Sequence, residues 1–115
     1  MALTKRARSE QSQPVIPDSE TFLGDELLAV PTTAGGTAFA SVPNGARHAY
    51  LMNLDASNKV ILRLNATGIG GNPDSTHGIV IGPGAGFDLT TDPSQAKLLG
   101  VGGTVNVFAT YFGEQ

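Results

Sequence analysis

Short runs in which hydrophobic and polar residues alternate fill most of the chain after Gly35. In Lys59–Leu64 the apolar residues Val60, Leu62 and Leu64 fall on one side of an extended backbone. This period of two is typical of a strand with one buried face. Residues 104–112 alternate in the same way, but both sides are partly apolar: Val105, Val107, Ala109 and Tyr111 against Thr104, Asn106, Phe108, Thr110 and Phe112. We expect one side of this last strand in the core and the other in a contact.

The alternating runs predict an all-β fold. They cover residues 37–42, 47–54, 58–66, 77–81, 86–90, 97–101 and 104–112, and turn residues such as Gly, Pro, Asn and Asp separate them. Strands at this spacing predict an antiparallel β-sandwich or small jelly roll of about seven to eight strands. Residues 47–54 and 58–66 form the clearest hairpin pair, and residues 66–74 are expected to form a long surface loop. Residues 22–30 fit a short helix or a first strand, and Pro31 ends either one.

Composition narrows the function classes. The chain has 115 residues, which favours one domain, and it contains 15 Gly and 7 Pro, which argues against long helices. A net charge of -3 argues against nucleic-acid binding, which normally needs a basic face. We also expect no membrane span, since no apolar run reaches about 18 residues. With no Cys there is no disulfide.

The start of the chain has the composition of an extended arm. Residues 1–21 are mostly polar, and a segment that buries little apolar surface does not offset the entropy cost of ordering. The residues after the N-terminal cations are polar, so no export signal is expected. A terminus without a role is one interpretation, and an arm that binds a partner is the other. The arm residues expected to bind are Lys5, Arg6, Arg8, Pro14, Val15, Ile16, Pro17 and Phe22, with the body at residues 22–115.

The candidate chemical groups do not form a recognisable active site. The glycine-rich segment from Gly82 to Gly86 is followed by a strand-like run, whereas phosphate-binding loops precede a helix, so we expect a tight turn. His48 and His77 could act as bases or ligands together with carboxylates at Asp74, Asp88 and Asp92. Catalytic and metal sites need defined spacings that these residues lack. We therefore expect surface positions, no catalytic residues, no metal, no cofactor and no enzyme activity.

The second half of the chain resembles a known family. From residue 59 to residue 112 it carries VILRLNATG, HGIVIGPGAGFDL and AKLLGVGGTVNVFATYF: a Pro-Gly turn before a Phe-x-Leu strand, an apolar strand, a Gly-Gly turn and a terminal Val-x-Val strand. This pattern resembles small virion proteins of tailed bacteriophages, especially capsid decoration or cement proteins. The resemblance implies a structural protein on the capsid exterior, made in the host cytoplasm, with an arm that clamps neighbouring subunits.

The same resemblance implies the partners. These are the major capsid protein and further copies of the chain in a dimer or trimer, with neither nucleic acid nor membrane. Aromatic residues that often fill subunit contacts supply the expected contact or ligand patch: Tyr50, Phe108, Tyr111 and Phe112. The alternative is a head-fibre, tail or receptor- or carbohydrate-binding module, whose ligand patch would surround Tyr50, Tyr111 and residues 68–74.

Overall fold

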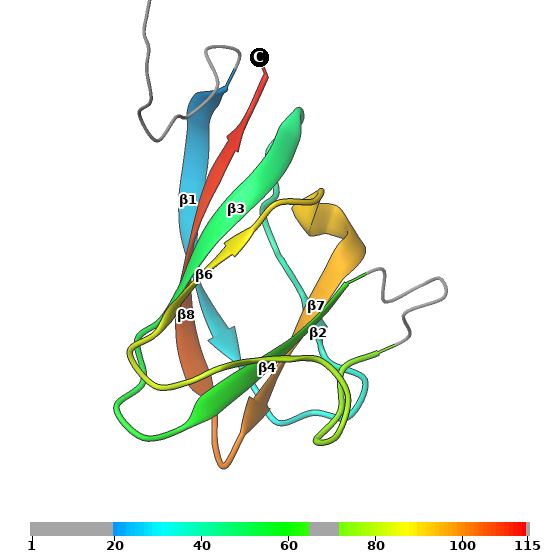
Figure 1. Ribbon diagram of the computed structural model, residues 1–115, viewed down its shortest axis with the longest axis vertical. Coiled ribbons are helices and arrows are strands. Elements are labelled where there is room, and N and C mark those ends of the chain that lie inside the picture. Colours follow the sequence, from blue (N-terminus) through cyan, green and yellow to red (C-terminus); the bar gives the residue numbers. More distant parts are fainter. Residues whose placement is uncertain (1–19, 65–71, 115) are drawn as a thin grey trace, which may run out of the picture.

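The computed structural model describes residues 20–64 and 72–114, which form two antiparallel four-stranded sheets packed as a sandwich (Figure 1). The first sheet has the order β1-β8-β3-β6, with bounds Thr21–Val30, Val105–Gly113, Ala46–Asn53 and Gly86–Leu89. The second has the order β2-β7-β4-β5, with bounds Thr37–Ala38, Ala96–Val101, Lys59–Leu64 and Ile79–Ile81. The all-β sandwich predicted from the sequence is confirmed.

The strand pairing is that of a jelly roll. Strand β1 pairs with β8, β2 with β7, β3 with β6 and β4 with β5, all antiparallel. This is the pattern of one long hairpin, β1 to β4 against β5 to β8, rolled up so that its paired strands alternate between two sheets. Rolling also places β3 beside β8 and β4 beside β7. In Figure 1 the end of β8 therefore lies beside the starts of β1 and β3.

The core lies between the sheets and follows the predicted alternation. Fully buried side chains come from both inner faces: Val30, Leu51, Val60, Leu62, Leu98, Val105, Val107 and Tyr111. Phe39, which follows β2, packs edge-on against Tyr111 with ring centroids 6.2 Å apart. Burial of these apolar side chains is the main favourable term in folding.

Several strand boundaries differ from the prediction. The segment that fitted either a helix or a strand is strand β1. The run at residues 37–42 shortens to Thr37–Ala38, because Phe39 leaves the sheet to enter the core. The run at residues 77–81 begins only at Ile79, since His77 belongs to a turn closed by its backbone pairing with Asp74. The predicted surface loop also holds the fully buried Pro73.

The predicted hairpin of residues 47–54 and 58–66 is wrong. Its two strands, β3 and β4, belong to different sheets, and the short segment between them crosses from one sheet to the other. Asn53 explains the crossing. Its buried side-chain amide donates to the Ile81 carbonyl at 3.1 Å and to the Asn58 carbonyl at 3.0 Å, and its Oδ1 accepts from Asp55 N at 2.8 Å. These bonds tie the end of β3 to the opposite sheet.

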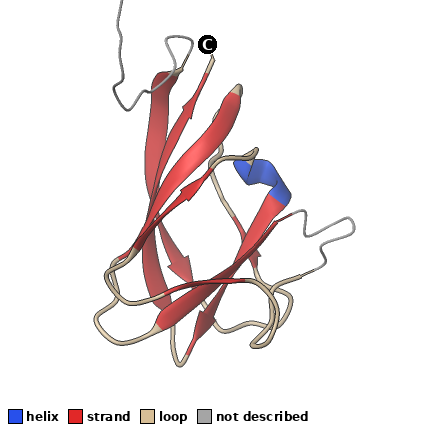
Figure 2. Cartoon of the chain, viewed as in Figure 1, coloured by secondary structure: helices blue, strands red, loops and turns tan. Residues whose placement is uncertain are grey.

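The turn expected at Gly82–Gly86 is confirmed. Ala85 N donates to Gly82 O at 3.0 Å, and Gly84 has φ +73°, a conformation that favours glycine. The described helical structure is the short 3-10 helix η2 (Pro93–Gln95), so strands and loops dominate Figure 2. Within residues 20–64 and 72–114, no helix has the length and apolarity needed to span a membrane.

Candidate interaction surface

The outer face of the first sheet carries a group of partly exposed apolar and aromatic side chains. Alternation directs them away from the core, and the sheet brings them together from three strands. We call this group the aromatic face: Phe22, Leu27, His48, Tyr50, Met52, Phe108 and Phe112. Leu27 is 59% exposed, Phe22 54% and Tyr50 43%. Exposed apolar groups of this kind mark contact or ligand sites on soluble proteins.

Register places the members of the aromatic face in rows across the sheet. Phe22 on β1 pairs with Phe112 on β8, which pairs with His48 on β3. The Phe22 and Phe112 rings meet edge to face with centroids 6.3 Å apart, and the His48 ring stacks on Phe112 at 5.0 Å. A second row holds Leu27, Phe108 and Met52. Neighbouring side chains in such rows stabilise the sheet and present a continuous surface.

Tyr50 lies between these rows and extends over β6. A Cβ built on Gly86 would lie only 2.1 Å from the Tyr50 hydroxyl oxygen, so the ring occupies the space that glycine leaves open. Tyr50 pairs with Asp88 of β6 on one side and with Thr110 of β8 on the other, and Thr110 pairs in turn with Asp25 of β1. The aromatic face therefore has a carboxylate at each lateral border.

Carboxylates also surround His48 at one end of the face. Its Nδ1 lies 2.9 Å from Glu20 Oε1, and its Nε2 lies 3.8 Å from Asp88 Oδ1. Nearby Arg47 is paired with Glu114 at 3.0 Å. The predicted surface histidine thus lies half-buried between two acids and stacks on an aromatic ring. The border of the face is acidic, which favours a partner that combines apolar and cationic groups.

The structure brings three of the four predicted contact residues together. Tyr50, Phe108 and Phe112 share the aromatic face, and Phe22, assigned to the arm from the sequence, lies beside them because β1 already begins at Thr21. Tyr111 does not belong to this surface. It is fully buried, since it lies one residue from Phe112 in a strand and so faces the core.

Tyr111 has a structural role instead. Its hydroxyl donates a hydrogen bond to Glu26 Oε2, which also accepts from Ser41 N at 2.9 Å. Burial raises the pKa of the Tyr111 phenol, and the bond to the Glu26 carboxylate raises it further. The remaining arm residues expected to bind a partner, Lys5 to Pro17, lie outside the described residues.

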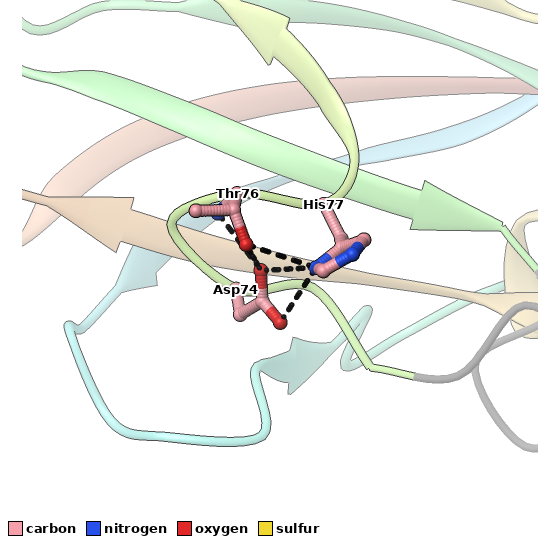
Figure 3. A network of polar contacts seen from close by, with 3 residues as sticks. All are labelled: Asp74, Thr76 and His77. Carbon is pink, nitrogen blue, oxygen red and sulfur yellow. Dashed lines mark hydrogen bonds and ion pairs between the residues drawn. The ribbon is translucent and has the colours of Figure 1, made fainter.

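The other candidate polar residues belong to turns. Asp74 Oδ1 accepts from Thr76 N at 2.8 Å and from Thr76 Oγ1 at 3.0 Å, and it lies 2.9 Å from His77 Nδ1 (Figure 3). The Thr76 N–H and then His77 lower the pKa of Asp74 to about 2. Asp92 caps η2 by accepting from Ser94 N at 3.0 Å. Among the described residues, no three His, Asp or Glu side chains gather as a metal site would require.

The outer face of the second sheet is different. Its central apolar row contains Ile61 and Leu99, which are only 2% and 8% exposed, whereas Val80 at the edge is 58% exposed. The aromatic face is therefore the broader exposed apolar surface of the described chain.

Comparisons of the chain with models of protein families, with curated proteins and with solved structures give no match.

Proposed function

We propose that the chain is a structural virion protein that binds a phage capsid as a decoration or cement subunit. The observation that carries the proposal is the aromatic face, an exposed apolar surface on a rigid sheet with carboxylates at its borders. A subunit that stabilises a shell must bury such a surface against its partner, and a sheet whose backbone is already ordered lowers the ordering cost of binding. The jelly roll recurs in viral capsid domains, which supports the proposal by analogy of fold.

The major capsid protein is the proposed main partner, and further copies of the chain, as a dimer or trimer, are the second. The acidic border of the face favours a shell surface that places Lys or Arg around an apolar centre. The cations of the arm, Lys5, Arg6 and Arg8, would bind acidic groups on a neighbouring subunit. Two weak contacts on one chain raise the overall affinity through effective concentration.

The test is cosedimentation of the purified full chain with capsids that lack their own decoration protein. Leu27→Glu and Val80→Glu form a matched pair, because the two residues are 59% and 58% exposed on the outer faces of opposite sheets. We expect saturable binding by the original chain, a loss of at least about tenfold for Leu27→Glu, equal to about 1.4 kcal/mol, and no change for Val80→Glu. Equal effects of the two variants, or no binding by the original chain, would contradict the proposal.

A head-fibre, tail or receptor- or carbohydrate-binding module is the second candidate. The observation that favours it is the exposed Tyr50 ring beside Asp88, since sugars bind to an aromatic ring with a polar group at its edge. Tyr111 cannot contribute to that ligand patch, because it lies in the core. A chain that ignores capsids but binds a glycan array, with the binding lost in Tyr50→Ala, would favour this alternative.

A further inference from the structure

The side chain of Glu20, the first described residue, lies on the aromatic face. Glu20 directly precedes β1, an edge strand, yet its carboxylate lies 2.9 Å from His48 on β3. Strand β8 separates β1 from β3, and neighbouring strands are about 4.8 Å apart, so the Glu20 and His48 side chains together span about 9.6 Å between the two strands. They do so only when the Glu20 side chain lies across β8, and both partners are mostly buried there. The Glu20 side chain therefore lies on this face, so the first described residue of the chain is held against it.

The sequence places an apolar segment within reach of the face. Pro14, Val15, Ile16 and Pro17, the proline-flanked segment, lie three to six residues before Glu20. An extended chain covers about 3.1 to 3.5 Å per residue, so the segment extends from about 10 to about 20 Å from Glu20. Along β3, Tyr50 lies about 7 Å and Met52 about 13 Å from His48. The segment can thus lie over Tyr50 and the row of Leu27, Phe108 and Met52.

The chemistry of the segment fits the surface. Each proline lacks a backbone N–H, so fewer donors lose their water when the segment covers apolar side chains. Proline-flanked chains are also extended before binding and pack well on aromatic rings. Val15 and Ile16 carry no charge that the acidic border would repel. We propose that the proline-flanked segment binds the aromatic face of its own chain in the free subunit.

The same-chain segment is favoured over a second copy for two reasons. A tether of a few residues gives the segment a local concentration in the millimolar range, far above the concentration of another copy. Two copies packed face to face would also bring together surfaces bordered by Asp25 and Asp88, and like charges repel. The inference concerns the isolated chain and does not rest on the capsid role. A shell that binds the aromatic face would displace the segment.

Engineered cysteine pairs test the contact in the full chain, which has no Cys of its own. The test variant is Val15→Cys with Tyr50→Cys, and its control is Val15→Cys with Val80→Cys, because Val80 is exposed on the outer face of the other sheet. Under mild oxidation we expect an intrachain disulfide to form at least about tenfold faster in the test pair, since only that pair is held close. Equal rates in the two pairs would overturn the proposal.

Mixing experiments separate the possible occupants. Chains with Val15→Cys alone, mixed with chains that carry Tyr50→Cys alone, are expected to give no more disulfide dimers than a mixture with Val80→Cys. An excess of mixed dimers would show that a neighbouring copy supplies the segment, and rapid dimers of Tyr50→Cys with itself would show face-to-face packing. Either result overturns the proposal.

A second measurement avoids the geometry of a disulfide. A spin label on Val15→Cys is expected to broaden the NMR signals of Tyr50, Met52 and Phe108 in dilute solution, while those of Val80 stay sharp. Broadening that disappears when the labelled chain is diluted into unlabelled chain, or that affects both faces equally, would contradict binding within the chain.

Discussion

Replacing Asn53 tests the crossing between the two sheets. Its side chain makes three hydrogen bonds, to Asn58 O, Ile81 O and Asp55 N, and the residue is fully buried. Each lost bond costs about 1 kcal/mol net, so Asn53→Ala should lower the free energy of unfolding by about 3 kcal/mol. For a body of this size that corresponds to a fall in Tm of at least about 12 °C. Total stabilities are about 5 to 15 kcal/mol, so the loss is large.

Asn53→Asp sharpens the test. The new carboxylate would replace an N–H donor with an oxygen facing two carbonyl oxygens, so the variant should be less stable than Asn53→Ala at neutral pH. Burial raises the pKa of such a carboxyl in the folded state. Its protonated form can donate one bond, so the variant should regain stability at low pH and lose it as pH rises through the folded pKa.

The assay is urea and thermal unfolding followed by circular dichroism, with Asn106→Ala as the control. Asn106 is an exposed asparagine on β8, and its replacement should change the free energy of unfolding by less than about 0.5 kcal/mol. Equal effects of Asn53→Ala and Asn106→Ala would refute the argument that Asn53 ties the two sheets together.

Three further predictions follow from contacts away from the aromatic face. Tyr111→Phe should lower the free energy of unfolding by about 1 to 2 kcal/mol, because the bond to Glu26 is lost. Since the pKa of Tyr111 is raised in the folded state, the original chain should also lose stability above about pH 10, whereas the variant should not. Unfolding measured against pH checks both effects. The ionised Asp74 carboxylate stabilises the fold, and this stabilisation is lost as the pH falls from about 4 to about 2, because the pKa of Asp74 is lowered to about 2 in the folded state. In Asp74→Asn the unfolding midpoint should therefore fall less steeply across this pH range. Gly78→Ala should lower the free energy of unfolding in urea by about 1 to 3 kcal/mol, because Gly78 has φ +139° and an added Cβ would lie 2.3 Å from a side-chain carbon of β4. Its control is Gly82→Ala, which has open space around it and should lower the free energy of unfolding by less than about 0.5 kcal/mol.

Local patterns predicted the strands and their faces but not how the strands pair. Alternation in β4 and β8 correctly separated core positions such as Val60 and Val107 from outward ones. A short polar connection between two strands is common to hairpins and to crossings between sheets, so residues 54–58 gave no sign of which was present. The side chain that decides, Asn53, bonds to Ile81, which lies 28 residues away. Only the folded chain reveals such a partner.

The same limit applies to the candidate site. Aromatic character suggested a contact at Tyr50, Phe108 and Phe112, and strand pairing brings these residues together. Alternation along β8 already separates Tyr111 from Phe112, so the sequence contained the signal that excludes Tyr111 from this surface. The contact between Glu20 and His48 had no comparable signal, because it depends on the order β1-β8-β3.

The two outer faces differ in how far the described residues cover their apolar side chains. On the second sheet, the outward Ile61 is 2% exposed, and the backbone at Gly78 lies close against it. On the first sheet, the outward Leu27 is 59% exposed, so residues 20–64 and 72–114 leave it largely uncovered. The described residues on either side of 65–71 lie at the second sheet: Leu64 ends β4, and Asn72 Oδ1 accepts from Lys97 Nζ of β7 at 3.5 Å. Glu20, the first described residue, already contacts His48 on the aromatic face at 2.9 Å, and this contact is the starting point for the proposal that the proline-flanked segment binds that face.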